Sequence, residues 1–252
     1  MEKIILILTI DVLLVSYGIT AGAHIKLFYQ TSAVRSPVYA LEKDEPSNPA
    51  QINRPAKPGP PKKSGGPVLQ GLLLVNKERG LPADYAPSDL VNPDIAFIPG
   101  RDWQDRLMRR EAAAAVERLF DAARGEKIEL YGVSAYRSYR KQSGIFTRNA
   151  KLMGEREANR LSARPGQSEH QTGLAIDISS PGMGGLLSAE FGNTREGLWL
   201  QENAPRFGFI IRYPRGKESV TGYRYEPWHI RYVGVRHAEA ISRSGQTLEE
   251  YL

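Results

Sequence analysis

Hydrophobic and polar positions divide the chain into three unequal parts. An apolar run from Ile4 to Val15, interrupted by Asp11, dominates residues 1–29. Residues 30–67 hold eight of the 17 prolines and few apolar residues, a composition that cannot bury enough surface to form a core. From residue 68 onward, short apolar runs alternate with amphipathic stretches. We therefore predict an N-terminal segment (1–29), a linker (30–67) and one folded domain (68–252).

The folded part combines apolar runs with helical periodicity. Apolar runs predict strands over residues 72–75, 128–134, 175–178 and 209–211, and another around 226–233. An apolar stripe predicts a helix over residues 101–124. Further helices are expected after the capping residues Ser138, Thr194 and Thr247, and over residues 235–242. Four prolines predict an irregular loop over residues 81–99.

Residues 1–29 have features of an export segment. Lys3 precedes the apolar run, and Ala21-Gly22-Ala23 has the small-x-small form that signal peptidases cleave. An uncleaved membrane anchor is the alternative, because about 20 apolar residues span a bilayer core. Asp11 disfavours both, since a carboxylate at the membrane centre costs roughly 2.5–3.5 kcal/mol. We predict an exported, extracytoplasmic protein, either membrane-anchored or associated with the cell wall, whose linker acts as a spacer rather than as a Pro-rich docking motif.

Charge and cysteine content narrow the possible partners. The chain has no cysteine, which excludes disulfides and thiolate metal sites. Its formal net charge of +6 favours attraction to a polyanion such as nucleic acid, an anionic cell wall or a lipid surface. No nucleic-acid-binding motif accompanies the charge, so we favour the wall. We predict no nucleic-acid partner, membrane contact through the N-terminal segment alone, and a monomer.

His170, Asp177 and His229 form the strongest candidate site. Two imidazoles and one carboxylate can hold zinc tetrahedrally with the fourth position open to water, which becomes a nucleophile near neutral pH. Glu226, three residues before His229, is a candidate general base. In a regular strand these two side chains point to opposite faces, but Pro227 predicts an edge or a bulge that brings both to one site. A structural role for each single histidine is the alternative.

Two more candidates lie beyond the predicted strand over residues 128–134. Arg137 follows that strand, and Gln142 lies in the first turns of the helix capped by Ser138, so both side chains can face one cleft. The planar guanidinium of Arg137 can bind two carboxylate oxygens or stabilise an oxyanion. A surface salt bridge is the alternative role for Arg137.

The motifs resemble those of a known family of enzymes. Ser168-x-His170-x-x-Gly173-x-Ala175-x-Asp177, followed by Glu226-x-Trp228-His229, is similar to the paired motifs of VanY-type zinc D-alanyl-D-alanine carboxypeptidases. Leu74-Val75-Asn76-Lys77, and Ser134-x-Tyr136-Arg137-Ser138 with Gln142, resemble the same family in the same order. The resemblance runs from about residue 72 to residue 235. It implies an α+β fold with a small, mostly antiparallel sheet that carries the zinc site, shared with lysostaphin-like peptidases and the hedgehog domain.

The resemblance also implies a function. We expect a zinc metallocarboxypeptidase, a hydrolase that removes the C-terminal D-alanine from peptidoglycan stem peptides. In this interpretation Glu226 takes a proton from the zinc water and passes it to the leaving amine, Arg137 binds the substrate carboxylate or the oxyanion, and Ser168 and Gln142 form hydrogen bonds to the substrate.

Two alternatives stay open. The motifs do not separate a pentapeptide ending in D-Ala-D-Ala from a tetrapeptide whose D-Ala follows a diamino acid, which would make the enzyme an L,D-carboxypeptidase. A noncatalytic wall-binding module is the alternative of a different class. Glu226 beside all three metal ligands argues against it, because such a module needs no base.

Overall fold

The computed structural model describes residues 71–252, so the predicted N-terminal segment and linker lie outside the described residues. The strands are β1 (Leu90–Val91), β2 (Met108–Arg109), β3 (Tyr131–Ser134), β4 (Ala175–Ser179), β5 (Phe209–Tyr213) and β6 (Glu226–Tyr232). The α-helices are α2 (Arg110–Gly125), α3 (Tyr139–Met153), α4 (Glu155–Leu161), α5 (Arg195–Asn203), α6 (Glu218–Thr221), α7 (Val235–Ser244) and α8 (Leu248–Tyr251). Five 3₁₀ turns complete the described elements: η1 (Trp103–Arg106), η2 (Glu169–Thr172), η3 (Pro181–Met183), η4 (Ala189–Asn193) and η5 (Ala204–Phe207).

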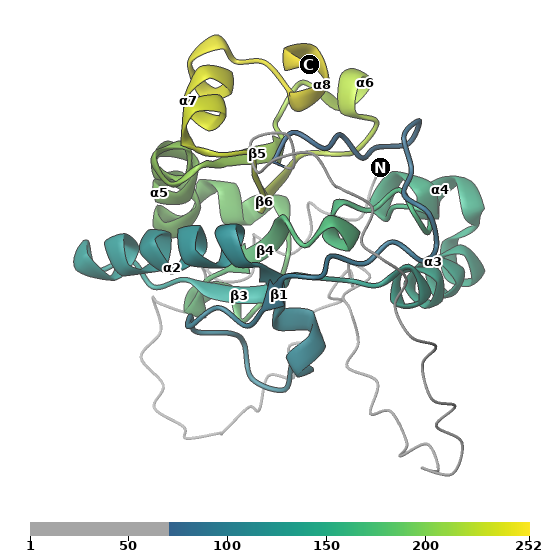
Figure 1. The fold of residues 1–252 in the computed structure, drawn as a ribbon, viewed down its shortest axis with the longest axis horizontal. Coiled ribbons are helices and arrows are strands. Elements are labelled where there is room, and N and C mark those ends of the chain that lie inside the picture. Colours follow the sequence, from purple (N-terminus) through teal and green to yellow (C-terminus); the bar gives the residue numbers. More distant parts are fainter. Residues whose placement is uncertain (1–70) are drawn as a thin grey trace, which may run out of the picture. The chain divides into compact units, whose positions relative to one another are not determined.

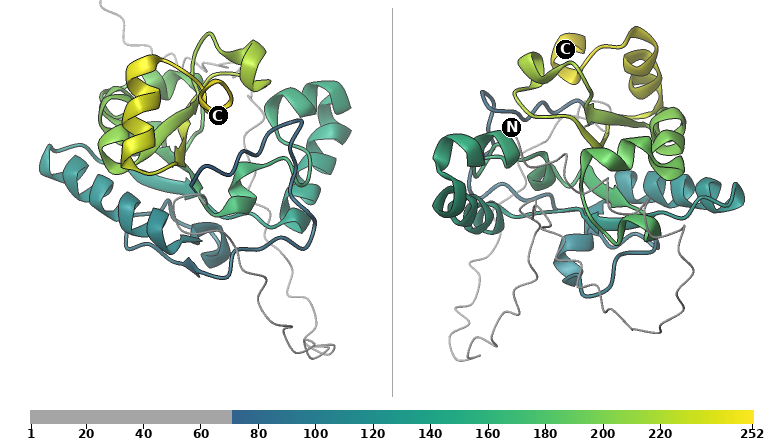
Figure 2. Two further views of the ribbon diagram at one scale, coloured as in Figure 1. Left: turned by 45° about the horizontal axis from the view of Figure 1, so that its top comes forward. Right: turned by 180° about the vertical axis from the view of Figure 1, so that it is seen from behind.

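A four-stranded sheet lies at the centre of residues 71–252 (Figure 1). Its strand order is β3-β4-β6-β5, and each neighbouring pair is antiparallel. β1 and β2 form a separate antiparallel pair. α7 packs beside β5, and α3 and α4 pack against each other to one side of the sheet (Figures 1 and 2). The predicted α+β fold with a small antiparallel sheet is confirmed.

The two faces of the sheet differ in polarity. Successive side chains of a strand point to opposite faces. In β4, Ile176 and Ile178 pack into the main core with apolar residues of α2 and α5, and Asp177 between them faces the other way. In β6, Ile230 joins the same core, while His229 faces the other way. The second face therefore carries the candidate site.

The helix predicted over residues 101–124 begins later than expected. Residues 103–106 form the turn η1, residues 108–109 form β2, and the helix starts at Arg110. Trp103, which the periodicity places on the buried stripe, is 63% exposed. The backbone of this stretch pairs with the residues that follow β3 instead of continuing a helix: Ala135 N–H donates to the Asp105 carbonyl at 2.6 Å, and Tyr136 N–H donates to the Leu107 carbonyl at 2.9 Å. Tertiary pairing here overrides helix periodicity.

The strand predicted over residues 72–75 is also wrong, since this segment is irregular. Its backbone carbonyls have a different partner. Arg231, fully buried on β6, donates from Nη2 to the carbonyls of Gly71 at 3.1 Å and Leu73 at 2.7 Å. Val75 is fully buried in the same segment. The apolar run thus covers the sheet without joining it.

Several local predictions are confirmed. Ser138, Thr194 and Thr247 each cap a helix, and Thr247 forms a capping box with Glu250. The stretch from 81 to 99 has no helix and contributes only the short strand β1 and one isolated bridge. Helix caps can be predicted from the sequence because both hydrogen-bonding partners lie within one turn.

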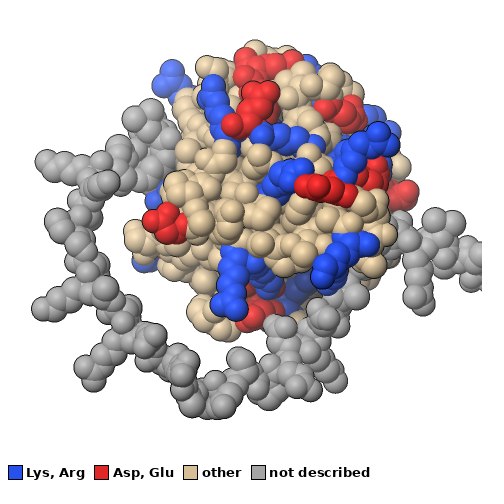
Figure 3. Space-filling view, turned by 90° about the vertical axis from the view of Figure 1, so that its right-hand side faces the viewer, with Lys and Arg blue, Asp and Glu red and all other residues tan. Residues whose placement is uncertain are grey.

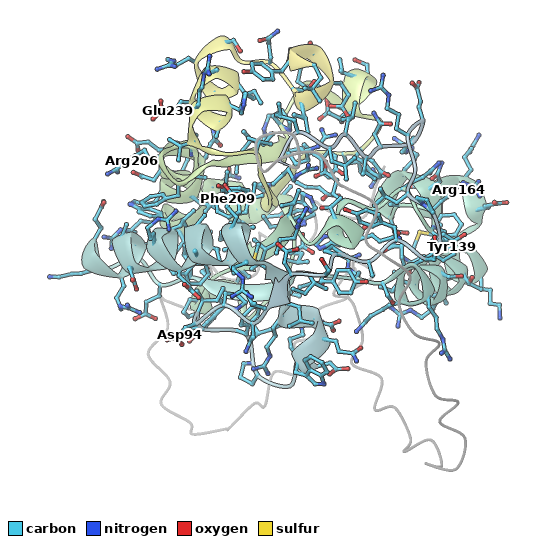
Figure 4. All side chains as sticks on the ribbon, in the orientation of Figure 1. Asp94, Tyr139, Arg164, Arg206, Phe209 and Glu239 are labelled. Atoms are coloured by element: carbon cyan, nitrogen blue, oxygen red, sulfur yellow. The ribbon has the colours of Figure 1, made fainter. Side chains whose placement is uncertain are left out.

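The periphery and the interior separate clearly. Phe209 points into the domain and is fully buried, whereas Arg164 and Arg206 lie exposed at its surface (Figure 4).

Among the helices of residues 71–252, none combines the length and apolar character that crossing a bilayer requires.

We expect the start of the folded domain to lie between residues 68 and 76. A chain starting at Val68 should unfold with the same free energy as the full chain. A chain starting at Asn76 loses both carbonyls that accept from the buried Arg231. Hydrogen bonds to charged groups contribute roughly 1.5–3 kcal/mol each, so this second chain should be clearly less stable in urea unfolding. Equal stability of the two truncated chains would show that the boundary is wrong.

Candidate metal centre and active site

Asp177 and His229 meet because the sheet register places them opposite each other. They are direct cross-strand partners on β4 and β6, and such partners have Cβ atoms about 4.5–5.5 Å apart. His229 Nδ1 lies 2.9 Å from Asp177 Oδ1. Both side chains are buried.

His170 reaches the same point from η2, the turn before β4. Its Nδ1 lies 2.6 Å from the Ala135 carbonyl, which can only accept, so Nδ1 carries the proton. Its Nε2 lies 3.3 Å from Asp177 Oδ2 and is left with a free lone pair. Burial and the Arg137 charge lower the pKa of His170 to about 4, despite the opposing effect of Asp177. The imidazole is therefore neutral near pH 7, as a metal ligand must be.

The three residues suit a zinc ion. One donor atom from each of His170, Asp177 and His229 lies within 4.8 Å of the others. Burial alone would lower the pKa of His229, but the carboxylates of Asp177 and Glu169 outweigh it and raise the pKa to about 9. The two carboxylates thus favour a positive charge at His229. A zinc ion would supply that charge in place of the proton.

Glu226 reaches the same site through a bulge. The register between β5 and β6 shifts between Ile211 and Tyr213, where Tyr213 pairs with Glu226. The irregularity predicted at Pro227 is confirmed, although β6 is a central strand and not an edge. Glu226 Oε2 therefore lies 4.0 Å from His229 Nδ1, with 15% of its side chain exposed.

The environment of Glu226 suits proton transfer. Burial raises the pKa of Glu226 to about 7, the negative charge of Asp177 acting in the same direction against the opposing effects of His229 and Arg137. A group with a pKa near the working pH can both accept and return a proton.

Arg137 is buried beside the candidate metal ligand Asp177. A role in a salt bridge at the surface, the alternative considered from the sequence, is therefore excluded. Its Nη2 lies 3.2 Å from Asp177 Oδ2, its Nη1 donates to Gln142 Oε1 at 2.9 Å, and its Nε donates to Ser134 Oγ at 3.3 Å. Its backbone N–H donates to the His170 carbonyl at 3.2 Å. The guanidinium is thus held in one orientation.

Gln142 and Ser168 occupy different surroundings. The Gln142 side chain is buried, and its amide nitrogen donates to the Ala163 carbonyl at 2.7 Å while its oxygen accepts from Arg137. Ser168 is buried at the start of η2, two residues before His170. Gln142 therefore contacts Arg137 directly. Ser168 lies two residues before the candidate metal ligand His170 in the sequence.

Comparison with known proteins gives the family. The family model described as VanY, D-alanyl-D-alanine carboxypeptidase, matches residues 105–235, just over half of the chain. The chain belongs to the VanY family. The resemblance inferred from the motifs is confirmed, and membership makes this VanY-family chain a zinc-dependent carboxypeptidase, a hydrolase.

Relatives of this VanY-family chain agree in sequence and fold. YodJ of Bacillus subtilis (strain 168), named as a carboxypeptidase, is 53% identical over 71% of the chain and 66% of YodJ. The structure of the LdcB LD-carboxypeptidase is 53% identical and superposes with a TM-score of 0.68 over 71% of this chain and 83% of that one. A mutant of the vancomycin-resistance D,D-pentapeptidase VanY in complex with Zn(II) is 36% identical, with a TM-score of 0.60 over 72% and 98% of the two chains. The prediction that the cofactor is zinc is therefore confirmed.

The sequence interpretation missed a buried ionic cluster behind the VanY-type site. Glu169, Arg212 and Arg231 are fully or almost fully buried, and both arginines donate to Glu169. Tyr213 packs against His229 with ring centroids 5.0 Å apart. One sequence signal was available: Arg212 and Arg231 interrupt otherwise apolar strands, on the face that carries Asp177 and His229.

Proposed function

We propose that this enzyme hydrolyses the bond before the C-terminal D-alanine of peptidoglycan stem peptides, with zinc held by His170, Asp177 and His229. One observation carries the proposal. The three donor groups converge in a buried site, and a carboxylate with a pKa near neutrality lies within 4.0 Å of one of them. A peptide hydrolase needs both an electrophile and a proton carrier at one point.

Zinc, when bound there, supplies a Lewis acid for the scissile carbonyl and lowers the pKa of a water molecule. Glu226 takes a proton from the attacking water and returns it to the leaving amine. His170 is kept neutral and correctly oriented by the Ala135 carbonyl. Burial of the site strengthens each of these interactions.

Arg137 binds the negative charge of the substrate. Its guanidinium is already oriented by Gln142, Ser134 and Asp177, and each terminal nitrogen has a second N–H to offer. That N–H can meet the developing oxyanion or the terminal carboxylate. We assign Gln142 the role of holding Arg137, and we retain Ser168 as a donor of a substrate hydrogen bond.

The location follows from the substrate. Cell-wall peptidoglycan lies outside the cytoplasm, so we propose an extracytoplasmic enzyme in which residues 1–29 direct export or anchor the chain and residues 30–67 act as a spacer. Electrostatic association with an anionic wall is part of the same proposal. On the face that carries α3 and α4, however, Lys and Arg alternate with Asp and Glu (Figure 3). Pairs such as Arg164–Glu155 offset the positive charge there.

An L,D-carboxypeptidase is the second candidate function. The identity of 53% to the LdcB LD-carboxypeptidase exceeds the 36% identity to the D,D-pentapeptidase VanY, and this observation favours it. The two activities share the zinc site and differ in the residue that precedes the terminal D-Ala.

Defined muropeptides test the proposal and separate the candidates. The zinc-loaded full chain should convert pentapeptide stems to tetrapeptides with release of D-alanine, detected by mass spectrometry, and should lose this activity with a chelator and regain it with zinc. Higher kcat/KM on tetrapeptides ending in D-Ala would replace the D,D assignment with the L,D one. No cleavage of either substrate by folded, zinc-loaded protein would favour a noncatalytic module.

A further inference from the structure

Two buried polar atoms face each other behind the candidate metal centre. His229 Nε2, on the ring edge away from the centre, lies 3.6 Å from Glu169 Oε2. Neither atom has a hydrogen-bond partner among residues 71–252. Their separation is slightly longer than a formed hydrogen bond. Leaving both atoms unpaired and desolvated is unfavourable, so closing this small gap stabilises the site.

Glu169 is held firmly from its other side. Its Oε1 accepts from Arg212 Nε at 2.8 Å and from Arg231 Nη1 at 2.6 Å. The side chains of all three residues are fully buried. Burial alone would raise the pKa of Glu169, but the two guanidiniums outweigh it and hold the pKa well below its usual range. Because Oε1 accepts from two guanidiniums, Glu169 is the acceptor in a bond to His229.

Both ends of the described chain stabilise this cluster. Arg212 donates to both oxygens of Glu249 on α8, at 2.8 and 2.6 Å. Arg231 donates to the carbonyls of Gly71 and Leu73. Two buried arginines, each also bonded to another part of the chain, thus fix the position of the Glu169 carboxylate.

We propose that Glu169 is a positioning residue of the metal centre, which accepts the Nε2–H of His229 and so leaves Nδ1 with its lone pair directed at the metal. A neutral imidazole carries one proton, and a partner at one nitrogen decides which nitrogen is free. Carboxylate partners of this kind orient metal-bound histidines and raise their basicity. The inference rests on the proposed role of His229 as a ligand.

A purely structural role for Glu169 predicts different behaviour, and three variants of the full chain separate the two roles. Glu169→Gln removes the charge. Glu169→Asp keeps the charge near Arg212 and Arg231 but withdraws the carboxylate from His229 by one methylene. Glu249→Gln is the matched control, because it also removes a carboxylate from Arg212 but does not contact His229.

Two readouts do not depend on turnover. Zinc affinity is measured by competition with a chromogenic chelator, and unfolding of the metal-free protein reports stability. NMR of histidine-labelled, zinc-loaded protein reports the Nε2–H of His229, identified among four histidines by His229→Ala. We expect both Glu169 variants to bind zinc about 10–100-fold more weakly and to lose or shift this proton signal, and Glu249→Gln to match the wild type in both.

The outcomes are distinct. The inference would be overturned if Glu169→Asp binds zinc with wild-type affinity and keeps an unchanged Nε2–H signal. If Glu169→Gln does not fold, Glu169→Asp alone provides the test. Weakening by Glu249→Gln equal to that by Glu169→Asp would show that the cluster acts only through stability, which also overturns it. If His229→Ala binds zinc as well as the wild type, the ligand assignment in the proposed function fails instead.

Discussion

Replacing Glu226 by glutamine is expected to lower kcat about 10²–10⁴-fold while zinc content stays near that of the wild type. Glutamine keeps the size of the side chain and some hydrogen bonding but cannot accept the proton of the attacking water. The loss should appear in kcat more than in KM, because the missing interaction matters mainly in the transition state. Steady-state kinetics on muropeptides, with metal analysis of the same samples, make the measurement.

The pH profile gives the same prediction a second test. Burial raises the pKa of Glu226 to about 7, so its basic form is lost as the pH falls through that value. A nearby zinc ion favours the carboxylate, so the acidic limb of kcat/KM should lie at or below about pH 7. This limb should be absent from the residual activity of Glu226→Gln.

Glu190→Gln is a suitable control, because Glu190 is exposed on η4 and the chemical change is identical. It should match the wild type in rate and zinc content. Full activity of zinc-loaded Glu226→Gln would contradict the mechanism. Loss of zinc from Glu226→Gln would instead make Glu226 a ligand, and one of the three assigned ligands would need another role.

Local patterns in the sequence predicted much of the fold. The strand around Asp177 alternates polar and apolar residues as a sheet with two different faces requires, and the helix caps lie within one turn of their partners. The error at residues 101–109 has a different origin. Helical periodicity is present there, but hydrogen bonds to residues 135 and 136 hold the segment extended or in a 3₁₀ turn. Such long-range pairing leaves no local signature.

The candidate site was predictable where its residues share a motif. His170 and Asp177 lie seven residues apart. Pro227 predicted the bulge that brings Glu226 close to His229. Two arginines in apolar strands signalled a buried charge, but their pairing with Glu169 was not predictable, because Arg212, Arg231, Glu249 and the segment at residue 71 come together only in the folded chain. The contact of Gln142 with Arg137 was missed for a related reason, since its amide also depends on the Ala163 carbonyl of another segment.

Substituting the three proposed ligands is expected to remove zinc from the protein. His170→Ala, Asp177→Asn and His229→Ala should each weaken zinc binding by more than the 10–100-fold typical of an outer-shell partner, because each loses a direct bond to the metal. The triple variant should retain no stoichiometric zinc, and carboxypeptidase activity should be lost with it. Asparagine is preferred at position 177, because it keeps an oxygen near the buried Arg137 Nη2.

His237→Ala is the matched control for this prediction. His237 lies on α7, where its Nδ1 contacts the Tyr251 hydroxyl at 2.9 Å, away from the three converging donors. It should bind one zinc per chain with wild-type affinity and cleave the same substrates. Stoichiometric zinc in the triple variant would disprove the ligand set, whereas loss of zinc from His237→Ala alone would place the metal elsewhere. Zinc lost from the single variants without loss of cooperative unfolding would show that these residues hold the metal rather than the fold.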